Sequence, residues 1–413
     1  MIDRNYESNC EMNKERNCFM ELIAAMSMAM DMEENIKLYH GWRCAVFADR
    51  IGKTMGIIGD DLFFGGLLHD IGALGVEDHL VHRILNGRFL NDPLIINHPK
   101  KGAEILRKLP GMKSVALYVE DHHERWDSQG YPAGKKEDEI SLGGQVIMAA
   151  DLIDLELRRL DAEKVSESFK RFKTFFRPDV FEASMEVLTD ISFVSTAADY
   201  SNLKPLIDSR IRTSNCFLVD SDIEDTYIEV FADIIDAKHL YTGGHSRRVG
   251  EYSQYIAWEL NLDPAARKDI YKAALLHDIG KVAVPKRILD APRRLSDDEF
   301  KIIKQHPVHT IELLRTVSLL SRLAEPAGLH HERHDGKGYP LGLKDSEIPL
   351  YSKIISLADS LEAITSDRAY QKRRSFEEAA AIIAENRGTQ FDPEIAGAAL
   401  EVIKGMTEKE KIS

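Results

Sequence analysis

The sequence is poor in cysteine and in long apolar runs, and each shortage excludes a class of protein. Its 413 residues include four scattered cysteines, Cys10, Cys18, Cys44 and Cys216, with no CxxC pair. This argues against a disulfide framework and favours a reducing compartment. The apolar-rich segment 19–30 contains Glu21 and is too short to span a bilayer. No apolar signal region with a cleavage site precedes it. We therefore expect a cytoplasmic protein with no membrane partner.

Positive charge is also scarce. Lysine and arginine number 54 against 68 aspartate and glutamate residues, for a net charge of −14. Binding to long nucleic acid through a broad basic surface is therefore not expected, although a small phosphorylated ligand is allowed. The composition, 44% apolar and 30% charged, is that of a globular protein. A chain of this length favours two domains over one core.

A repeated motif supports this division. HHERHDGKGYP begins at His330, and HHERWDSQGYP begins at His122, which is 208 residues earlier. LLHDIG occurs at residues 67–72 and again at 275–280, and a His-Pro pair occurs at His98 and again at His306, with the same offset. Asp151 and Asp359 complete the series. An unchanged spacing across four anchors indicates an internal duplication.

Helical periodicity accompanies these anchors, and strand-like alternation is sparse. His40 and His245 are equivalent at an offset of 205, and each begins an apolar stripe at i, i+4, i+7 and i+11. Both histidines should therefore face a core, and Cys44, on the first stripe, is interpreted as a packing residue. We predict an all-α protein made of two tandem helical bundles.

The limits of these bundles are predicted from weaker signals. Residues Ser195–Ser221 are polar and irregular, typical of a connection, and Ile223–Ala237 should form the first helix of the second copy. We place the domains at 1–204 and 205–413. The second HD pair should end a helix, with Gly280 in the left-handed conformation common at that position.

The second copy contains seven imidazole or carboxylate side chains suited to metal binding and no thiolate: His245, His277, Asp278, His306, His330, His331 and Asp359. A mixed nitrogen and oxygen set favours a first-row divalent metal, iron or manganese, over a cysteine-rich zinc site. Seven ligands exceed the need of one ion that keeps a position open. We expect two ions sharing Asp278.

Together these motifs resemble the HD-GYP phosphohydrolases, a branch of the HD superfamily that hydrolyses cyclic dinucleotides. The resemblance covers residues 228–403 through GGHSRRV, HDIGK, HHE, DGKGYP, LADSLEAITSDRAY and GTQFDP. It implies that His245, His277, Asp278 and Asp359 hold one metal and that Asp278, His306, His330 and His331 hold the second. It also implies that Lys281 is a catalytic phosphate contact beside Asp278, that Arg368 is another contact, and that Gly338, Tyr339 and Pro340 line the substrate pocket.

Some positions depart from the family pattern. Tyr241 stands where three-metal members carry a glutamate, which favours two metals. Glu362 replaces an aspartate, and Gln371 replaces a basic residue. Glu332 is left with two interpretations, a side chain that orients a ligand or a surface residue.

The first copy retains the ligand set and has lost the phosphate contacts. His40, His69, Asp70, His98, His122, His123 and Asp151 form a second candidate metal site. Ala73, however, replaces Lys281, and Ser128 and Gln129 replace Gly336 and Lys337. We expect a regulatory or structural role for this copy, with metal or ligand binding left open.

The resemblance implies hydrolysis of cyclic di-GMP or 3′,3′-cyclic GMP-AMP to a linear dinucleotide. Two metals would lower the pKa of a water molecule and stabilise charge on the phosphate oxygens. A general HD nucleotidase would not need the GYP loop, and a non-catalytic effector that binds a cyclic dinucleotide would not need Lys281. A homodimer and a signalling-protein partner both remain open.

Overall fold

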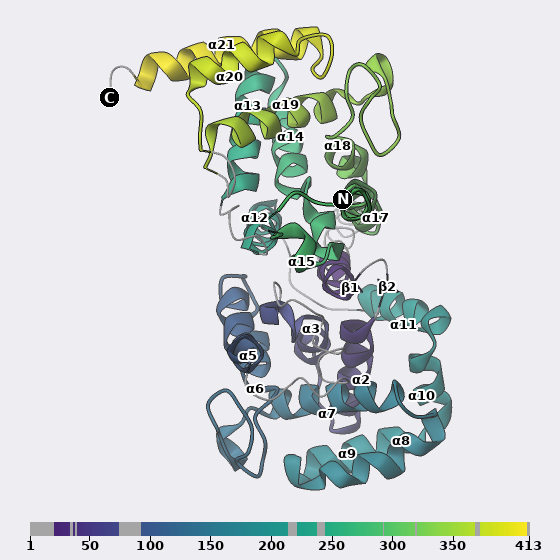
Figure 1. Cartoon of the computed structure of the whole chain (residues 1–413). Helices are drawn as coiled ribbons and strands as arrows, with labels where there is room; N and C mark the ends of the chain where they lie inside the picture. Colours follow the sequence, from purple (N-terminus) through teal and green to yellow (C-terminus); the bar gives the residue numbers. More distant parts are fainter. Residues whose placement is uncertain are drawn as a thin grey trace, which may run out of the picture. The chain divides into compact units, whose positions relative to one another are not determined.

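The protein is described from a computed structural model, for residues 20–33, 36–37, 39–73, 92–213, 221–237, 244–291, 293–318, 320–367 and 372–410. The regular elements of the described chain are helices apart from one two-stranded antiparallel pair, so the all-α prediction is confirmed. It divides into two compact units, Met1–Glu224 (unit 1) and Asp225–Ser413 (unit 2). Figure 1 shows the course of the chain.

The first described segment of unit 1, residues 20–30, is helical, and the two short strands follow it. Its named elements are β1 (Met32–Glu33), β2 (Ile36–Lys37), α2 (His40–Thr54), α3 (Asp61–Leu68), η1 (Ile71–Ala73), α5 (Pro93–Leu106), α6 (Lys113–Asp121), η2 (Glu137–Glu139), α7 (Leu142–Leu157), α8 (Ala162–Phe169), η3 (Lys170–Phe175), α9 (Pro178–Thr189), α10 (Ile191–Ala198) and α11 (Tyr200–Thr213).

Unit 2 has a similar order of helices around its predicted ligands, but different helices follow α19 than follow α7 in unit 1. Its elements are α12 (Ser221–Ala237), α13 (His245–Glu259), α14 (Pro264–Leu276), η4 (Ile279–Ala283), α15 (Lys286–Leu289), α16 (Asp297–Ile303), α17 (His306–Arg315), η5 (Ser321–Leu323), α18 (Ala324–Gly328), η6 (Asp345–Glu347), α19 (Leu350–Thr365), α20 (Phe376–Glu385) and α21 (Pro393–Glu410). The division between the units falls in the first turn of α12.

Three helices frame the centre of each unit. In unit 1, α2 packs against α3 and α7, and in unit 2, α13 packs against α14 and α19 (Figure 1). The predicted stripe of α2 is buried throughout, with His40, Cys44, Phe47 and Ile51 at most 2% exposed. Burial of this stripe fixes the rotation of α2 and so directs His40 inward.

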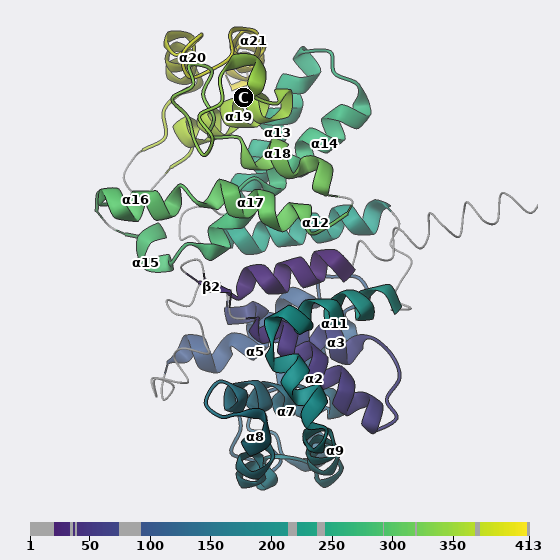
Figure 2. The same ribbon diagram turned by 90° about the vertical axis from the view of Figure 1, so that its right-hand side faces the viewer.

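The segment predicted to be an irregular connection is helical over most of its described length. Figure 2 shows α11 beside α2, and the helix buries Leu203, Ile207 and Ile211. These residues recur every four positions, which forms an apolar stripe among polar residues. The boundary predicted near residue 205 therefore falls inside α11.

The conformation predicted for Gly280 is wrong. This residue does not have a positive φ angle. A Cβ atom at this position would lie 2.0 Å from the carbonyl oxygen of His306 and 2.6 Å from the amide nitrogen of Thr310. Glycine is therefore needed because η4 packs closely against α17, and this contact places the second HD pair beside His306.

Within the described residues, no helix is both long enough and apolar enough to cross a membrane.

Candidate metal centre

Six of the seven predicted ligands of unit 2 lie at or just beyond helix ends. His245 is the first residue of α13, His277 is the C-cap of α14, and His306 is the first residue of α17. His330 and His331 follow α18, and Asp359 lies within α19. Side chains at helix ends can converge from several directions, and these helices are fixed by their own buried faces.

Asp278 lies at the middle of the group. Its Oδ2 atom is 3.7 Å from His245 Nε2 and 3.2 Å from His277 Nε2. Its Oδ1 atom is 3.3 Å from His306 Nε2 and 4.0 Å from His330 Nε2. The two oxygens of one carboxylate therefore face two separate pairs of imidazoles.

The orientation of the histidine rings is set by the backbone. The Nδ1 atoms of His277, His306 and His330 each donate a hydrogen bond to the carbonyl three residues earlier, at 2.6, 2.7 and 2.6 Å. A carbonyl only accepts, so the proton lies on Nδ1 and Nε2 faces the centre. This is the usual way in which proteins orient histidine ligands.

Several inward-facing atoms of unit 2 are buried without a hydrogen bond. Among the described residues these include Nε2 of His277, His306 and His330 and Oδ1 of Asp278. Leaving buried polar atoms unsatisfied is costly, so such a cluster requires an explanation. The donor atoms of His245, His277 and Asp359 lie within 4.8 Å of one another, as do those of His306, His330 and His331. Both groups fit a divalent metal that accepts nitrogen and oxygen ligands.

The charges in the centre favour an ionised carboxylate among mostly neutral imidazoles. Burial alone would raise the pKa of Asp278, but His277 and Lys281 hold it well below its usual value. Burial and neighbouring imidazoles lower the pKa of His330 to about 4, and lower that of His331 as well. At His277 the adjacent carboxylate outweighs burial and raises the pKa to about 9. An ionised carboxylate and neutral imidazoles are the forms that bind metal.

Glu362 orients the remaining histidine. Its Oε2 atom accepts from His245 Nδ1 at 2.7 Å, and its Oε1 atom accepts from Arg248 at 2.7 Å. The sequence singled out Glu362 only as a departure from the family pattern. Its spacing of three residues after Asp359 places both carboxylates on one face of α19.

Two cations lie close to the centre. Lys281, in η4, forms an ion pair with Asp278 Oδ2. Lys304, which the sequence analysis missed, lies 5.2 Å from the centre of the Tyr339 ring. The sequence could have indicated Lys304 only through its position two residues before the predicted ligand His306. Tyr241, Arg368 and Gln371 lie outside the described residues.

The loop with the GYP motif forms one side of the centre. The Tyr339 ring stacks on His331 at a centroid distance of 4.7 Å. A Cβ atom on Gly338 would meet the Arg333 amide nitrogen at 2.5 Å, which explains the glycine. Pro340 follows Tyr339 through a cis peptide bond.

Glu332 has neither of the two roles considered for it. It is buried, and it accepts hydrogen bonds from the backbone N–H groups of Leu341, Gly342 and Leu343, at 2.6, 3.1 and 2.9 Å. Glu332 therefore fixes the course of the loop and does not hold a metal ligand or lie at the surface. Its contacts depend on the folded loop, so sequence spacing does not reveal them.

Unit 1 builds a matching centre. Asp70 Oδ2 lies 3.7 Å from His40 Nε2 and 3.5 Å from His69 Nε2. Its Oδ1 atom lies 3.2 Å from His98 Nε2 and 4.0 Å from His122 Nε2. His123 stacks on Tyr131, and Asp151 lies 3.4 Å from His40. The structure therefore brings together all seven side chains of the first candidate set.

The surroundings of this centre differ from those in unit 2. Ala73 stands in place of Lys281, and Ile96, two residues before His98, stands in place of Lys304. Asp154 takes the role of Glu362 and accepts from His40 Nδ1 at 2.6 Å. Cys44 is fully buried, as predicted for a packing residue, yet its sulfur also lies within 4.8 Å of ligand atoms of His40, His69 and Asp151.

A model of the HD domain family matches residues 19–169 and 229–395, well over half of the sequence. The chain belongs to the HD domain family. Each matched segment of this HD protein contains one of the two centres described above. The family assignment made from the sequence is thereby confirmed.

Two characterised relatives from Vibrio cholerae align with most of this HD protein. 3′3′-cGAMP-specific phosphodiesterase 3 is 30% identical over 91% of this chain and 92% of its own length. 3′3′-cGAMP-specific phosphodiesterase 1 is 28% identical over 86% and 84%. A cyclic di-GMP phosphodiesterase from Thermotoga maritima is 39% identical over 44% of this chain and 50% of its own length.

The fold of this HD protein is also similar to a solved structure. A crystal structure of a cyclic GMP-AMP specific phosphodiesterase from V. cholerae (V-cGAP3) aligns with a TM-score of 0.65 and 28% identity. The alignment covers 94% of this chain and 97% of that one. The similarity therefore extends over both units.

Proposed function

We propose that this protein is a metal-dependent phosphodiesterase that hydrolyses a cyclic dinucleotide to a linear dinucleotide, with the reaction in unit 2. The observation that carries the proposal is the arrangement around Asp278, whose two oxygens face two pairs of imidazoles while Lys281 lies beside it. Buried nitrogen atoms without hydrogen bonds support a metal centre, and the nearby lysines support an anionic substrate.

Two divalent ions, iron or manganese, fit the seven ligands. His245, His277, Asp278 and Asp359 would hold one ion, and Asp278, His306, His330 and His331 would hold the other. When bound, such ions supply Lewis acidity and lower the pKa of water near the phosphate. The protein side chains would position these groups. Asp278 accepts a hydrogen bond from Lys281, and Glu362 accepts one from His245 and fixes its ring.

The substrate is held by cations and by the loop. The ammonium groups of Lys281 and Lys304 would offset the charge of the phosphate, as preorganised cations do in phosphoryl transfer. Gly338, Tyr339 and Pro340 would form the wall of the pocket, since Tyr339 stacks on His331 and Glu332 fixes the loop behind it. Arg368 would supply a further phosphate contact.

We propose 3′,3′-cyclic GMP-AMP as the preferred substrate and cyclic di-GMP as the second. The two relatives that align with most of the chain are named for 3′3′-cGAMP. The relative named for cyclic di-GMP that is described above aligns with 44% of it. A cytoplasmic location suits either substrate.

For unit 1 we propose metal binding without turnover and a regulatory or structural role. Four histidines of its candidate set surround Asp70 at distances that match those around Asp278. The two lysines near the unit 2 centre are replaced by Ala73 and Ile96, so a phosphate would meet fewer cations. We place this domain at Met1–Glu224 and the catalytic domain at Asp225–Ser413.

The test is chromatography of 3′,3′-cyclic GMP-AMP and cyclic di-GMP after incubation with Mn²⁺- or Fe²⁺-loaded protein under reducing conditions. We expect a linear dinucleotide from at least one substrate, and loss of this product in Asp278→Asn. The matched variant Asp70→Asn should retain activity. Thermal unfolding of both variants checks that they fold. No cleavage with either metal would contradict the proposed activity, and complete loss in a folded Asp70→Asn variant would contradict the division of roles.

A further inference from the structure

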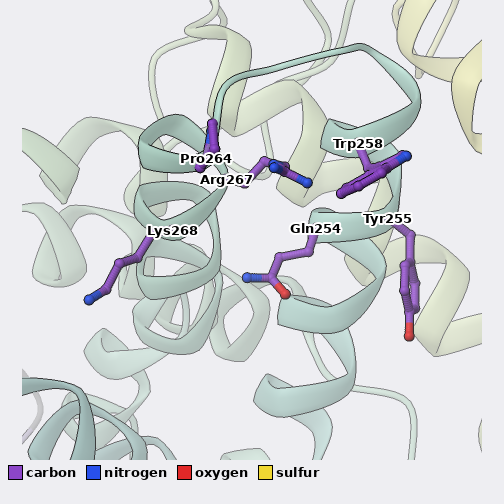
Figure 3. Close-up of a pocket in the computed structure, with 6 residues that line it drawn as sticks. All are labelled: Gln254, Tyr255, Trp258, Pro264, Arg267 and Lys268. Carbon is purple, nitrogen blue, oxygen red and sulfur yellow. The ribbon is translucent and has the colours of Figure 1, made fainter. Parts of the chain in front are cut away.

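Unit 2 carries an open groove between α13 and α14, away from the residues of the metal centre. It is a hollow of about 460 Å³ lined by Gln254, Tyr255, Trp258, Pro264, Arg267 and Lys268. Trp258 is 67% exposed and Tyr255 is 51% exposed. Figure 3 shows Arg267 pointing from α14 toward Trp258 on α13. Two large aromatic side chains exposed in one groove are typical of a protein interaction site.

The equivalent surface of unit 1 lies on α2 and α3, and its positions can be matched by counting from the ligands. Asp49 lies nine residues after His40, as Gln254 lies nine residues after His245. Asp60 lies nine residues before His69, as Lys268 lies nine residues before His277. In the same way, Arg50 matches Tyr255, ten residues after the first histidine, and Gly59 matches Arg267, ten residues before the second.

This surface of unit 1 is covered by the helical pair α10–α11. Arg210 of α11 lies against it and is only 13% exposed. Its guanidinium bonds to Asp49 at 2.9 Å, to the carbonyl of Gly59 at 3.0 Å and to Asp60 at 2.5 Å. The ring of Phe193 on α10 lies 5.0 Å from the guanidinium of Arg50, the residue that matches Tyr255. A helical pair with one aromatic and one cationic anchor therefore covers this surface.

The corresponding surface of unit 2 has the opposite charge. Arg267 and Lys268 stand where Gly59 and Asp60 accept hydrogen bonds in unit 1. Lys268 is engaged with Asp225 at 2.9 Å. The Arg267 guanidinium lies 4.4 Å from the Trp258 ring, and its Nε atom is buried with no hydrogen-bond partner among the described residues. The groove thus offers an aromatic surface and a cation that lacks a carboxylate.

We propose that this groove binds an acidic amphipathic helix of a partner protein. An apolar or aromatic side chain of the partner packs on Trp258 and Tyr255, and a carboxylate pairs with Arg267. In unit 1 a helix packs on the equivalent surface, and the positive charge of Arg267 favours an acidic helix in unit 2. The α11 helix of a second copy does not suit, because Arg210 would then meet Arg267. The proposal is independent of the proposed catalytic function.

The probe for this proposal comes from the chain itself. A fluorescein-labelled peptide of residues 190–213 is made in two forms, with the natural Arg210 and with Arg210→Glu. A hydrocarbon staple between positions 205 and 209, both exposed in unit 1, keeps α11 helical. Binding to the full-length protein is measured by fluorescence anisotropy. We expect the Arg210→Glu form to bind about fivefold more tightly, since one exposed charge pair contributes about that much.

Three protein variants decide the interpretation. Arg267→Glu should reverse the order of the two peptides, and Trp258→Ala should weaken both. Lys301→Glu changes an exposed charge on α16 and should leave binding unchanged. None of these residues belongs to the metal centre, so turnover and thermal unfolding should not change. Equal affinities, an order that Arg267→Glu does not reverse, or no binding of either peptide would overturn the proposal. So would sedimentation showing self-association that Trp258→Ala abolishes, because the occupant would then be a second copy.

Discussion

Each centre is organised by one carboxylate whose two oxygens are directed at different histidines. Asp278 and Asp70 make this division with closely matching distances, although their neighbours differ. The aspartate that follows each central histidine can face both groups because the preceding helix ends at that histidine. Glu362 contributes to this geometry as well, because its carboxylate accepts a hydrogen bond from His245 and holds that ring in place.

Replacement of Glu362 tests this positioning role. In Glu362→Gln, we expect metal affinity to fall about 10- to 100-fold, as is typical when the partner of a histidine ligand is lost. Glu362→Asp should retain most of the affinity, because Asp154 fills the same role in unit 1 with a shorter side chain. The measurement is metal content after dialysis against a series of metal buffers, together with kcat and KM. Equal metal binding by Glu362→Gln and the unchanged protein would contradict the role.

The close contact at Gly280 predicts a large effect of one methyl group. Because the obstructing atoms belong to the backbone of His306 and Thr310, Gly280→Ala should lower the free energy of unfolding by about 1–3 kcal/mol. Gly405→Ala is the matched control, because no other part of the protein lies within 4 Å of the added methyl group. Replacing a glycine inside α21 should raise the free energy of unfolding by about 0.5–1 kcal/mol. Urea unfolding measures both changes. A neutral Gly280→Ala variant would show that η4 and α17 can separate without cost.

Among the elements, the helices that carry ligands could be predicted from the sequence, and α11 could not. The HD pair indicated the end of α14, and the apolar stripes that begin at His40 and His245 indicated the helices α2 and α13 and their buried faces. In α11, Leu203, Ile207 and Ile211 are separated by polar residues and by Pro205, so the stripe is narrow. Its stability comes from packing on α2 and from Arg210, which depend on residues about 160 positions earlier.

Arg210 should therefore determine how firmly α11 packs on unit 1. We expect Arg210→Met to lower the free energy of unfolding by roughly 1–3 kcal/mol, because it leaves Asp49 and Asp60 without a charged partner that hydrogen-bonds to both. Lys204→Met removes an exposed pair on the same helix and should cost at most about 0.5 kcal/mol. Hydrogen exchange of α11 amides reports the packing directly. Unchanged protection in Arg210→Met would show that the apolar stripe alone holds the helix.

For the whole molecule, the prediction of two ligand sets came from the equal spacing of the repeated motifs. A constant offset of 208 residues selects six of the seven residues of each set, and the apolar stripe that begins at His40 and at His245 supplies the seventh at an offset of 205. The roles of Glu332 and Lys304 were not accessible in this way, since they arise from a folded loop and from a side chain near Tyr339. The open groove was also hidden, because it is defined by the difference between two folded units.

Metal removal should destabilise the protein, because it leaves clusters of buried donor atoms without a partner. A site loaded at 100 times its dissociation constant contributes about 2.7 kcal/mol, which corresponds to a rise of roughly 5–10 °C in Tm for a unit of this size. We expect chelation to lower Tm by that amount in calorimetry. Asp278→Asn should retain the part of the response due to unit 1. A response lost entirely in this variant would show that unit 1 binds no metal.

The course of α11 has a practical consequence for work with separate halves of the protein. A recombinant fragment that stops at residue 204 would retain the first five residues of α11 and lose Ile207, Arg210 and Ile211. Such a fragment would uncover the carboxylates of Asp49 and Asp60 beside an apolar surface, and we expect it to aggregate or be degraded. A fragment extended through Thr213 would keep the whole helix and should be the better behaved of the two.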